Sequence, residues 1–395
     1  MTSDLRRDRK IKLIYAVTIL YWCSIYMYAP ILGPYVEHLG GSLKMVGLVV
    51  GSYGFTQMLL RIPLGIYSDR LRRRKIFVSI GVALGVISSV GMGLVNNPWL
   101  VLVCRSLAGA AAATWVAFTV LYSSYFSPEE APRAMGVITF YSSIGQMVAT
   151  TFGGFAADYL GWTAPFVIGG LVGMVGLVLS AGIRENREAQ SQPIEVKELL
   201  QVGSDRILLS AAFLAILVQV LNFSTLHGFT PVYAMGIGAS KSQLSILSLV
   251  QLLPAAITSL KSGDWAQRFG TQRVVAAGFL LVSVFTLMIP FCQTVTGLFV
   301  TQALAGFGRG VIFPLLMGLS IRYIDNSKRA TAMGFFQSIY SLGMFGGPVL
   351  VGAIGDSLGL TGGFVTVGII GLVAAGLTLY LLRAQRFAHH PSVGA

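Results

Sequence analysis

Apolar runs of about 20 residues follow one another along nearly the whole chain, separated by short polar connections. Each run is long enough to cross a hydrocarbon core of about 30 Å as a helix. A spanning segment must satisfy its backbone hydrogen bonds internally, so the runs are expected to be helices and an open sheet is excluded. The pattern predicts an all-α membrane protein with twelve transmembrane helices, near residues 11–33, 44–66, 76–95, 99–126, 133–157, 163–183, 206–229, 242–262, 272–293, 297–323, 329–354 and 362–383.

The two halves of the chain repeat one another at an offset of 198 residues, the separation of Gly65 and Gly263. The same offset aligns Gly145 with Gly343 and the segment 158–163 with the segment 356–361. Six spans in each half are an even number, so the second copy enters the membrane in the same orientation as the first. The repeat therefore predicts two parallel-repeat six-helix bundles and a polar cytoplasmic linker, at residues 1–183, 206–395 and 184–205 respectively.

The net charge of +13 has a one-sided distribution. Of the 28 Lys and Arg residues, 23 lie in the tails and in one alternate set of connections, whereas the opposite set holds only Lys44 and Lys241. This asymmetry predicts that both termini are cytoplasmic, in a multi-pass protein of the plasma (bacterial inner) membrane. Because the basic residues are spread over membrane-edge loops, they indicate orientation in the bilayer, and no nucleic-acid partner is expected.

The sequence holds few groups that suit catalysis or metal binding. Cys23, Cys104 and Cys292 all lie in apolar spans, far apart, and are read as small buried hydrophobic residues. No phosphate-binding loop of the Walker type, zinc-ligand spacing or nucleophile elbow is found. We therefore expect no enzyme, no ATP-driven pump, no metal site and no cofactor.

A basic motif stands where the second span meets the cytoplasm, Gly65-x-x-x-Asp69-Arg70 followed by a basic run to Lys75. It resembles the signature loop between helices two and three of the major facilitator superfamily. The second glycine of that signature is Arg72 here, although it reappears as Gly270 in the second copy. The alternative is a solvated basic loop that only sets topology.

The resemblance implies a role for this loop in conformational gating. Gly65 would allow close helix approach, and Asp69 would accept hydrogen bonds from Arg133 or face a helix N-terminus. The other residues assigned to this latch are Arg70 and Arg73.

Glycines at regular intervals mark the fifth span, namely Gly136, Gly145, Gly153 and Gly154. The pattern resembles the fifth-helix motif of the superfamily's exporters, with the central Gly-Pro replaced by residues 149–150. The second half keeps the intact pair, and its gating residues are Gly343, Gly347 and Pro348. This resemblance to the 12-helix drug and metabolite efflux branch favours export; ordinary small-residue packing is the alternative.

Arg105, followed four residues later by Gly109, resembles the fourth-helix motif that the superfamily links to proton movement. The alternative is an arginine that reaches interfacial water by snorkelling. No carboxylate lies in the middle of a span, so Glu37, Asp69 and His227 are the substitute titrating groups. A lone histidine such as His227 is more often a packed or interfacial residue.

Arg309 lies about twelve residues into the tenth span, hence about 18 Å deep. Since the superfamily lines its central cavity with helices one, four, seven and ten, we expect Arg309 to face water or substrate. A buried arginine without a carboxylate partner is costly, and an anionic ligand would relieve that cost. The substrate is therefore expected to be anionic or zwitterionic.

Aromatic residues crowd the first helix and recur in the fourth and eleventh. They are interpreted as an amphipathic wall for an organic molecule, with helix packing and interfacial belts as the alternative. The substrate-contacting residues expected beside Arg309 are Tyr15, Trp22, Tyr26, Trp115, Phe336 and Tyr340.

The function expected from these features is secondary active transport by alternating access. The preferred form is proton-coupled efflux of an organic solute, drug-like or a secreted metabolite, by a monomer whose partners are that small molecule, H⁺ and the lipid bilayer. Uptake of an organic anion is the alternative within the same class. A lipid flippase and a sensor that transports nothing are the alternatives outside it.

Overall fold

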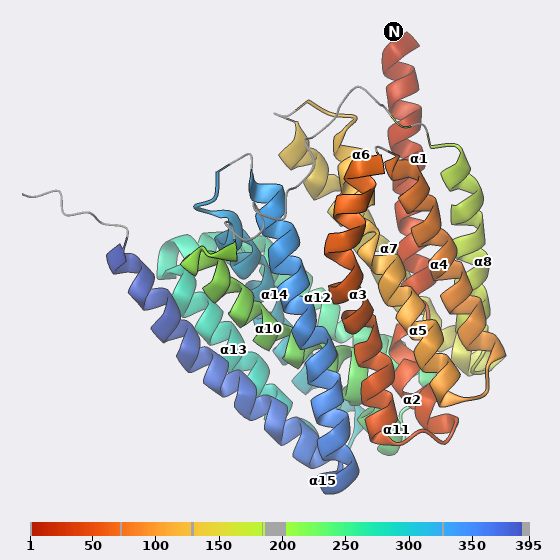
Figure 1. Cartoon of the computed structure of the whole chain (residues 1–395). Coiled ribbons are helices and arrows are strands. Elements are labelled where there is room, and N and C mark those ends of the chain that lie inside the picture. The colour runs from red at the N-terminus through yellow and green to blue at the C-terminus, as the bar shows by residue number, and fades with distance from the viewer. Residues whose placement is uncertain are drawn as a thin grey trace, which may run out of the picture. The chain divides into compact units, whose positions relative to one another are not determined.

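The computed structural model describes residues 2–71, 73–127, 130–183, 185, 203–325 and 328–388, and its regular elements there are all helical (Figure 1). In the first half they are α1 (Thr2–Tyr26), η1 (Ala29–Ile31), α2 (Leu32–His38), α3 (Leu43–Leu71), α4 (Arg74–Leu94), α5 (Pro98–Ala113), α6 (Trp115–Ser123), α7 (Ala131–Leu160) and α8 (Ala164–Ala181). In the second half they are α10 (Arg206–Ser224), η2 (Thr225–Phe229), α11 (Thr230–Gly236), α12 (Lys241–Phe269), α13 (Thr271–Leu287), η3 (Ile289–Phe291), α14 (Val295–Ile321) and α15 (Arg329–Ala388).

Ten helical segments in the described part of the chain are long and apolar enough to cross a membrane. One of them, Thr331–Leu382, has 52 residues and would be about 78 Å long as a single helix, more than twice a hydrocarbon core. Gly359 interrupts it with a φ of 72°, a left-handed conformation that glycine adopts without strain. The all-α membrane architecture is confirmed, and the count of twelve spans stays a prediction.

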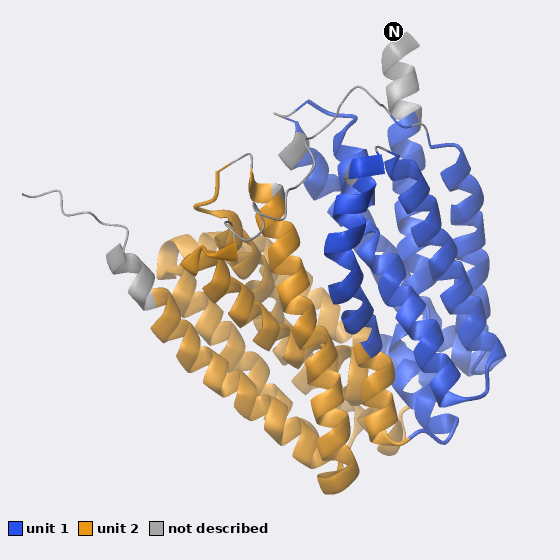
Figure 2. Cartoon of the chain, in the orientation of Figure 1, with its two compact units in different colours: residues 1–41, 52–195, 240–246 blue, residues 42–51, 196–239, 247–395 orange. Residues whose placement is uncertain are grey.

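Two compact units divide the chain, and each draws a short segment from the opposite repeat (Figure 2). Unit 1 comprises residues 1–41, 52–195 and 240–246, and unit 2 comprises residues 42–51, 196–239 and 247–395. The start of α3 thus belongs to unit 2, and the start of α12 belongs to unit 1. The repeat boundaries predicted from sequence do not anticipate this exchange, and most of the predicted linker 184–205 lies outside the described residues.

Aspartates at equivalent positions of the repeat hold the exchanged segments. In unit 2, Asp356 Oδ1 accepts a hydrogen bond from the backbone N–H of Lys44 at 3.1 Å. In unit 1, Asp158 Oδ2 accepts from the backbone N–H of Ser242 at 3.3 Å and from the hydroxyl of the same residue. Each carboxylate satisfies an N–H at the start of a helix, where such groups lack intrahelical partners.

The first span of each half is interrupted at the same place in the repeat. In the first half, α1 ends at Tyr26 and the 3₁₀ turn η1 follows, with Pro30 in its first turn. In the second half, α10 passes into η2, a single π-helical turn that begins at Thr225. The residue equivalent to Thr225 is Met27, so both interruptions fall at equivalent positions of the repeat. Irregular helical turns of this kind are frequent at functional sites.

Close glycine contacts join the fifth span of each half to the first. A Cβ on Gly145 of α7 would lie 2.7 Å from the carbonyl oxygen of Ile19, and one on Gly153 would overlap that of Met27. In unit 2, a Cβ on Gly343 of α15 would overlap the carbonyl oxygen of Ile216. The helices pack backbone to backbone here, which requires glycine.

Not every glycine predicted to allow close approach does so. The nearest atom to a Cβ on Gly65 would be Val116 Cγ1 at 3.7 Å, an ordinary van der Waals distance, so the expectation of a close contact there is wrong. Gly136 has no atom within 4 Å of such a Cβ.

Candidate functional site

Arg309 is the best-defined polar centre of unit 2. Its Nη1 donates to Gln251 Oε1 of α12 at 2.6 Å, and its Nη2 donates to Thr225 Oγ1 of η2 at 2.6 Å. The side chain is 6% exposed, and its Nε has no hydrogen-bond partner among the described residues. Both partners are neutral, so they give the Arg309 guanidinium two hydrogen bonds but no countercharge.

Two glycines on α14 explain why Gln251 lies within reach of this guanidinium. A Cβ on Gly306 would lie 2.6 Å from the carbonyl oxygen of Gln251 itself. One on Gly310 would overlap the carbonyl oxygen of Ala255, one turn further along α12. The backbones of α12 and α14 therefore approach closely on both sides of Arg309.

The π turn supplies the second partner. Thr225 Oγ1 donates to the carbonyl oxygen of Leu221 at 2.6 Å, which directs its free lone pairs to act as acceptors for Arg309. A threonine in a regular α-helix can donate the same hydrogen bond to the carbonyl oxygen one turn earlier. Thr225 differs because the wider π-helical turn η2 begins at this residue. Sequence reasoning missed Thr225 and Gln251, although an uncharged polar residue in an apolar span is a signal that points to such partners.

Other buried polar atoms of unit 2 lack partners among the described residues. Gln302 of α14 is fully buried, and neither its Nε2 nor its Oε1 is hydrogen-bonded there. The Nε2 of Gln251 and the Oδ1 of Asn222 are in the same condition. Buried polar atoms are nearly always satisfied, so unsatisfied ones in a span favour contact with water or a ligand.

Arg105 on α5 is a buried cation of unit 1, and it is held by aromatic rings. Its guanidinium carbon lies 4.5 Å from the ring centroid of Tyr53 and 5.5 Å from that of Tyr28. Its Nη1 also donates to the Tyr28 hydroxyl at 3.3 Å. At 5% exposure, Arg105 does not snorkel to interfacial water, so that alternative is wrong.

Three of the aromatic residues expected to contact substrate lie together in unit 1. Trp22 packs with ring-centroid separations of 5.2 Å from Trp115 and 5.7 Å from Tyr26. Tyr15 lies elsewhere, stacked on Tyr141 at 4.1 Å and hydrogen-bonded to the hydroxyl of Tyr122. The structure thus separates Tyr15 from the tryptophan group, although both were expected to belong to one amphipathic wall.

The unit 2 aromatics form a second group around a residue that the sequence did not single out. Phe313 of α14 lies 6.3 Å from Phe336 and 5.4 Å from Tyr340, measured between ring centroids. Phe336 is fully buried and packs inside the unit, whereas Tyr340 is half-buried.

The three residues assigned to proton coupling lie on separate elements. Arg105 lies on α5, and half-buried Glu37 lies near the end of α2. His227 belongs to the π turn η2 of unit 2 and packs against Phe223, with 4.9 Å between the ring centroids.

The structure describes most of the residues that were assigned to conformational gating, but not all of them. Arg70, Arg73 and Arg133 are exposed, but the side chain of Asp69 lies outside the described residues, and with it the predicted bond to Arg133. Gly154 is well placed: its N–H donates to Ser245 Oγ at 2.7 Å, and a Cβ there would overlap the carbonyl oxygen of Lys241.

Gly347 and Pro348 both lie inside α15. A Cβ on Gly347 would lie 2.8 Å from the carbonyl oxygen of Val220, so this position also requires glycine.

Apolar spans in two repeated halves, with buried arginines beside interrupted helices, define a multi-pass helical membrane protein of the transporter class. The family model of the Major Facilitator Superfamily matches residues 14–240 and 212–395. The chain belongs to the major facilitator superfamily, and at the level of that family it is a transporter and not an enzyme.

Similar proteins extend over most of the chain. An uncharacterized MFS-type transporter of Methanocaldococcus jannaschii is 21% identical over 95% of this chain and 98% of its own length. A multidrug resistance protein, MdtG of Salmonella arizonae, is 24% identical over 83% of this chain and 84% of its own. Among solved structures, a bacterial homologue of the human lysosomal transporter Spinster superposes with a TM-score of 0.81 at 17% identity, covering 98% of this chain and 99% of that one.

Proposed function

We propose that this protein is a secondary active transporter that exports an organic solute carrying negative charge, anionic or zwitterionic, by alternating access coupled to protons. Arg309 binds the charged group. The aromatic group around Phe313, in the same unit as Arg309, contacts the organic part of the solute.

The observation that carries this proposal is the charge balance at Arg309. The guanidinium is 6% exposed and is bonded to one amide oxygen and one hydroxyl oxygen. Moving a cation out of water costs several kcal/mol, and neutral acceptors return only part of that cost. An anionic group that bonds to the unpaired Nε would supply the missing countercharge.

Export is favoured over uptake by the glycine pattern of α7 and by the relative named for multidrug resistance. Proton coupling is assigned to Arg105, His227 and Glu37, and the loop with Gly65, Asp69, Arg70 and Arg73 to gating. Organic-anion uptake is the second candidate, because the charge at Arg309 suits it equally well.

Transport into inverted membrane vesicles tests the proposal. A panel of matched anionic, zwitterionic and cationic compounds is offered with and without a pH gradient. We expect accumulation of the anionic or zwitterionic members and its collapse when the gradient is dissipated. Accumulation only in right-side-out vesicles would establish uptake in place of export.

Arg309→Gln is the decisive variant, with Lys261→Gln as its control, because Lys261 is an exposed cation on α12. Loss of a buried charge-assisted contact of about 3 kcal/mol predicts roughly a hundredfold weaker transport of the anionic compound. The control is expected to transport normally. Equal transport by Arg309→Gln and wild type, at equal expression, would disprove the role of Arg309.

A further inference from the structure

Unit 2 carries a basic pocket at the end of its helices where the connections are rich in Lys and Arg. The cavity has a volume of about 830 Å³ and lies among α10, α12, α13, α14 and α15. Three cations line it, namely Arg268, Arg273 and Arg322, and no acidic residue does. We call this cavity the arginine pocket.

Nothing within the described part of unit 2 neutralises these three arginines by an ion pair. Arg268 and Arg322 lie over the rings of their own neighbours, Phe269 and Tyr323, at 5.2 Å and 5.4 Å. The nearby carboxylate of Asp205 is already used, since it accepts from two backbone N–H groups at the start of α10. The pocket therefore has a surplus of positive charge.

The equivalent place in unit 1 is filled by a carboxylate of the protein itself. Glu185 Oε1 accepts a hydrogen bond of 2.6 Å from the backbone N–H of Arg74, in the first turn of α4. At the offset of 198 residues, Arg74 corresponds to Gln272 in the first turn of α13, and Glu185 corresponds to Arg383. The first copy thus shows that a carboxylate can bind at the start of this helix. In the second copy the acidic residue, Glu185, is replaced by a basic one, Arg383.

The first turn of α13 lacks the cap that α4 has. Its N-cap residue is Gly270, which has no side chain to accept from the turn, and Gly270, Thr271 and Gln272 all line the arginine pocket. Unpaired N–H groups at the start of a helix add a partial positive charge to the side chains around them.

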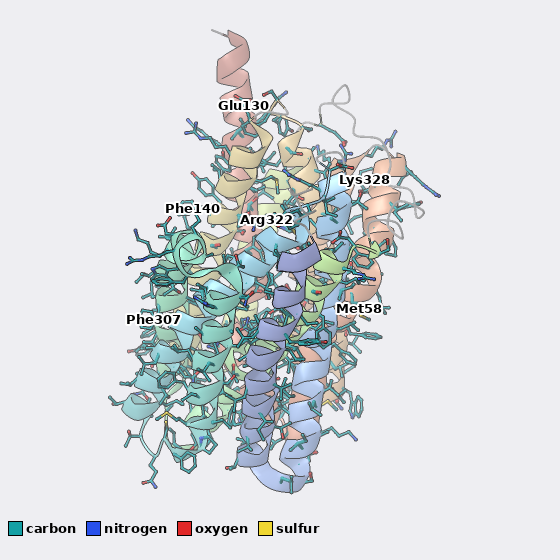
Figure 3. The ribbon with its side chains drawn as sticks, turned by 90° about the vertical axis from the view of Figure 1, so that its left-hand side faces the viewer. Met58, Glu130, Phe140, Phe307, Arg322 and Lys328 are labelled. Atoms are coloured by element: carbon teal, nitrogen blue, oxygen red, sulfur yellow. The ribbon has the colours of Figure 1, made fainter. Side chains whose placement is uncertain are left out.

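An apolar groove adjoins the arginine pocket and shares Phe269 and Arg273 with it. The groove has a volume of about 460 Å³ between α12, α13 and α14, and its exposed walls include Trp265, Leu281 and Phe307. Figure 3 labels Phe307, which lies on α14 and lines the groove, and Arg322, which directly follows α14 and lines the pocket.

The floor of the groove is kept open by two glycines. A Cβ on Gly308 would lie 2.6 Å from the carbonyl oxygen of Gly278, so α13 and α14 pack backbone to backbone and no side chain fills the space above them. The result is an apolar channel that starts at a cluster of guanidinium groups and continues along helices apolar enough to lie in a membrane.

We propose that the arginine pocket and the apolar groove together bind an anionic phospholipid, with its phosphate at Arg268, Arg273 and Arg322 and one acyl chain along the groove. Guanidinium groups bind phosphate oxygens in a bidentate manner, and basic pockets between helices at a membrane edge suit lipid head groups. The site lies within unit 2 and is separate from Arg309, so it stands whether or not the transported solute is an anion.

The fluorescence of Trp265 tests the site in the full-length protein reconstituted into phosphatidylcholine vesicles. Phosphatidylglycerol or phosphatidylcholine with brominated acyl chains is titrated in, and subtraction of the Trp265→Phe signal isolates the groove. We expect half-quenching at a phosphatidylglycerol content at least about fivefold below that needed for brominated phosphatidylcholine, since one arginine near a lipid surface contributes about 1 kcal/mol. Equal quenching by the two lipids would overturn the proposal.

Variants separate the charge from the groove. Arg268→Gln with Arg273→Gln is expected to raise the phosphatidylglycerol content at half-quenching by about tenfold, and Arg322→Gln alone by a smaller factor. Ala277→Phe, which fills the groove and keeps every charge, is expected to abolish the preference. Arg329→Gln, an exposed cation outside the pocket, is the matched control and should behave as wild type.

Inorganic phosphate distinguishes a lipid head group from a free anion. At millimolar concentration it is expected to leave the quenching unchanged, because it cannot occupy the groove. Reversal by phosphate alone, or quenching that is insensitive to all three arginines, would contradict a phospholipid site.

Discussion

Each unit holds a buried arginine beside its interrupted first span, Arg105 in unit 1 and Arg309 in unit 2, but the two are surrounded by different chemistry. Arg105 reaches residues 28 and 53, and Arg309 reaches residues 225 and 251. At the repeat offset, 251 corresponds to 53, and 225 to 27. The arginines themselves are not equivalent, because Arg309 corresponds to position 111, six residues and about 9 Å further along its helix than Arg105.

The contrast shows how one backbone arrangement supports two roles for a buried cation. In unit 1 the guanidinium lies on π faces, which stabilise its charge without forming strong hydrogen bonds. In unit 2 it is fixed by two short hydrogen bonds to neutral oxygens, which orient the group and leave its charge available. Arg309 therefore suits recognition of an anion better than Arg105 does.

Among substitutions of the residues that surround the two arginines, the largest effect is expected from Gln251→Glu, which places a carboxylate at the oxygen that Arg309 already contacts at 2.6 Å. The new ion pair should satisfy the charge and reduce binding of an anionic substrate by about tenfold or more. Binding of the preferred compound from the vesicle panel, measured with purified protein, checks this. Gln251→Leu removes the contact without adding charge and is expected to weaken binding less; the opposite order would show that hydrogen bonding, not charge, matters at Arg309.

An intermediate effect is expected from Tyr53→Leu in unit 1, which removes the closer of the two rings from Arg105. A desolvated cation–π contact contributes about 2 kcal/mol, so the melting temperature of the purified protein should fall by several degrees. Tyr53→Phe keeps the π face and should retain most of the stability. If Phe and Leu were equally destabilising, the Tyr53 hydroxyl and not its ring would support Arg105.

The smallest effect is expected at the exposed ends of the units, from Asp158→Asn. Hydrogen bonds from Ser242 hold the pKa of the Asp158 carboxyl below its ordinary value of 3.8. A lowered pKa in the folded state means that the contribution is present above pH 3.8 and is lost as pH falls through the lowered value.

Because Asp158 is exposed, solvent screening limits this contribution to less than about 1 kcal/mol. Melting curves of wild type and Asp158→Asn should therefore differ slightly at pH 7 and converge as the pH falls below 3.8. Asp356→Asn serves as the control from the other unit. A difference that grows on acidification would contradict the assignment to Asp158.

Much of the architecture follows from the sequence because lipid imposes strict rules on a chain. Run length and backbone hydrogen bonding predicted helices, and glycine spacing predicted the contacts of Gly145, Gly153 and Gly343. Burial of Arg309 followed from its depth in an apolar span. The sequence could not tell that Gly65 has room for a side chain while these three glycines do not. A close contact depends on the helix that faces the glycine, which the glycine itself does not reveal.

The rest depends on contacts between distant residues that carry no charge. Thr225 and Gln251 look like ordinary polar residues in the sequence, and only the π turn and the glycines of α14 bring them to Arg309. Tyr28 and Tyr53, whose rings hold Arg105, were not singled out in the sequence, because an aromatic residue in an apolar span gives no signal of its partner. The exchange of residues 42–51 and 240–246 between units has no pattern of its own, since both segments continue helices that start within them.

That exchange has a consequence for producing the protein in pieces. A chain divided at the linker would give two fragments, and neither would contain all the residues of one compact unit. The N-terminal fragment would lack 240–246, and the C-terminal fragment would lack 42–51. Each fragment would expose the aspartate that normally receives the other's helix start, so the halves are complementary parts of one polypeptide and not two autonomous domains.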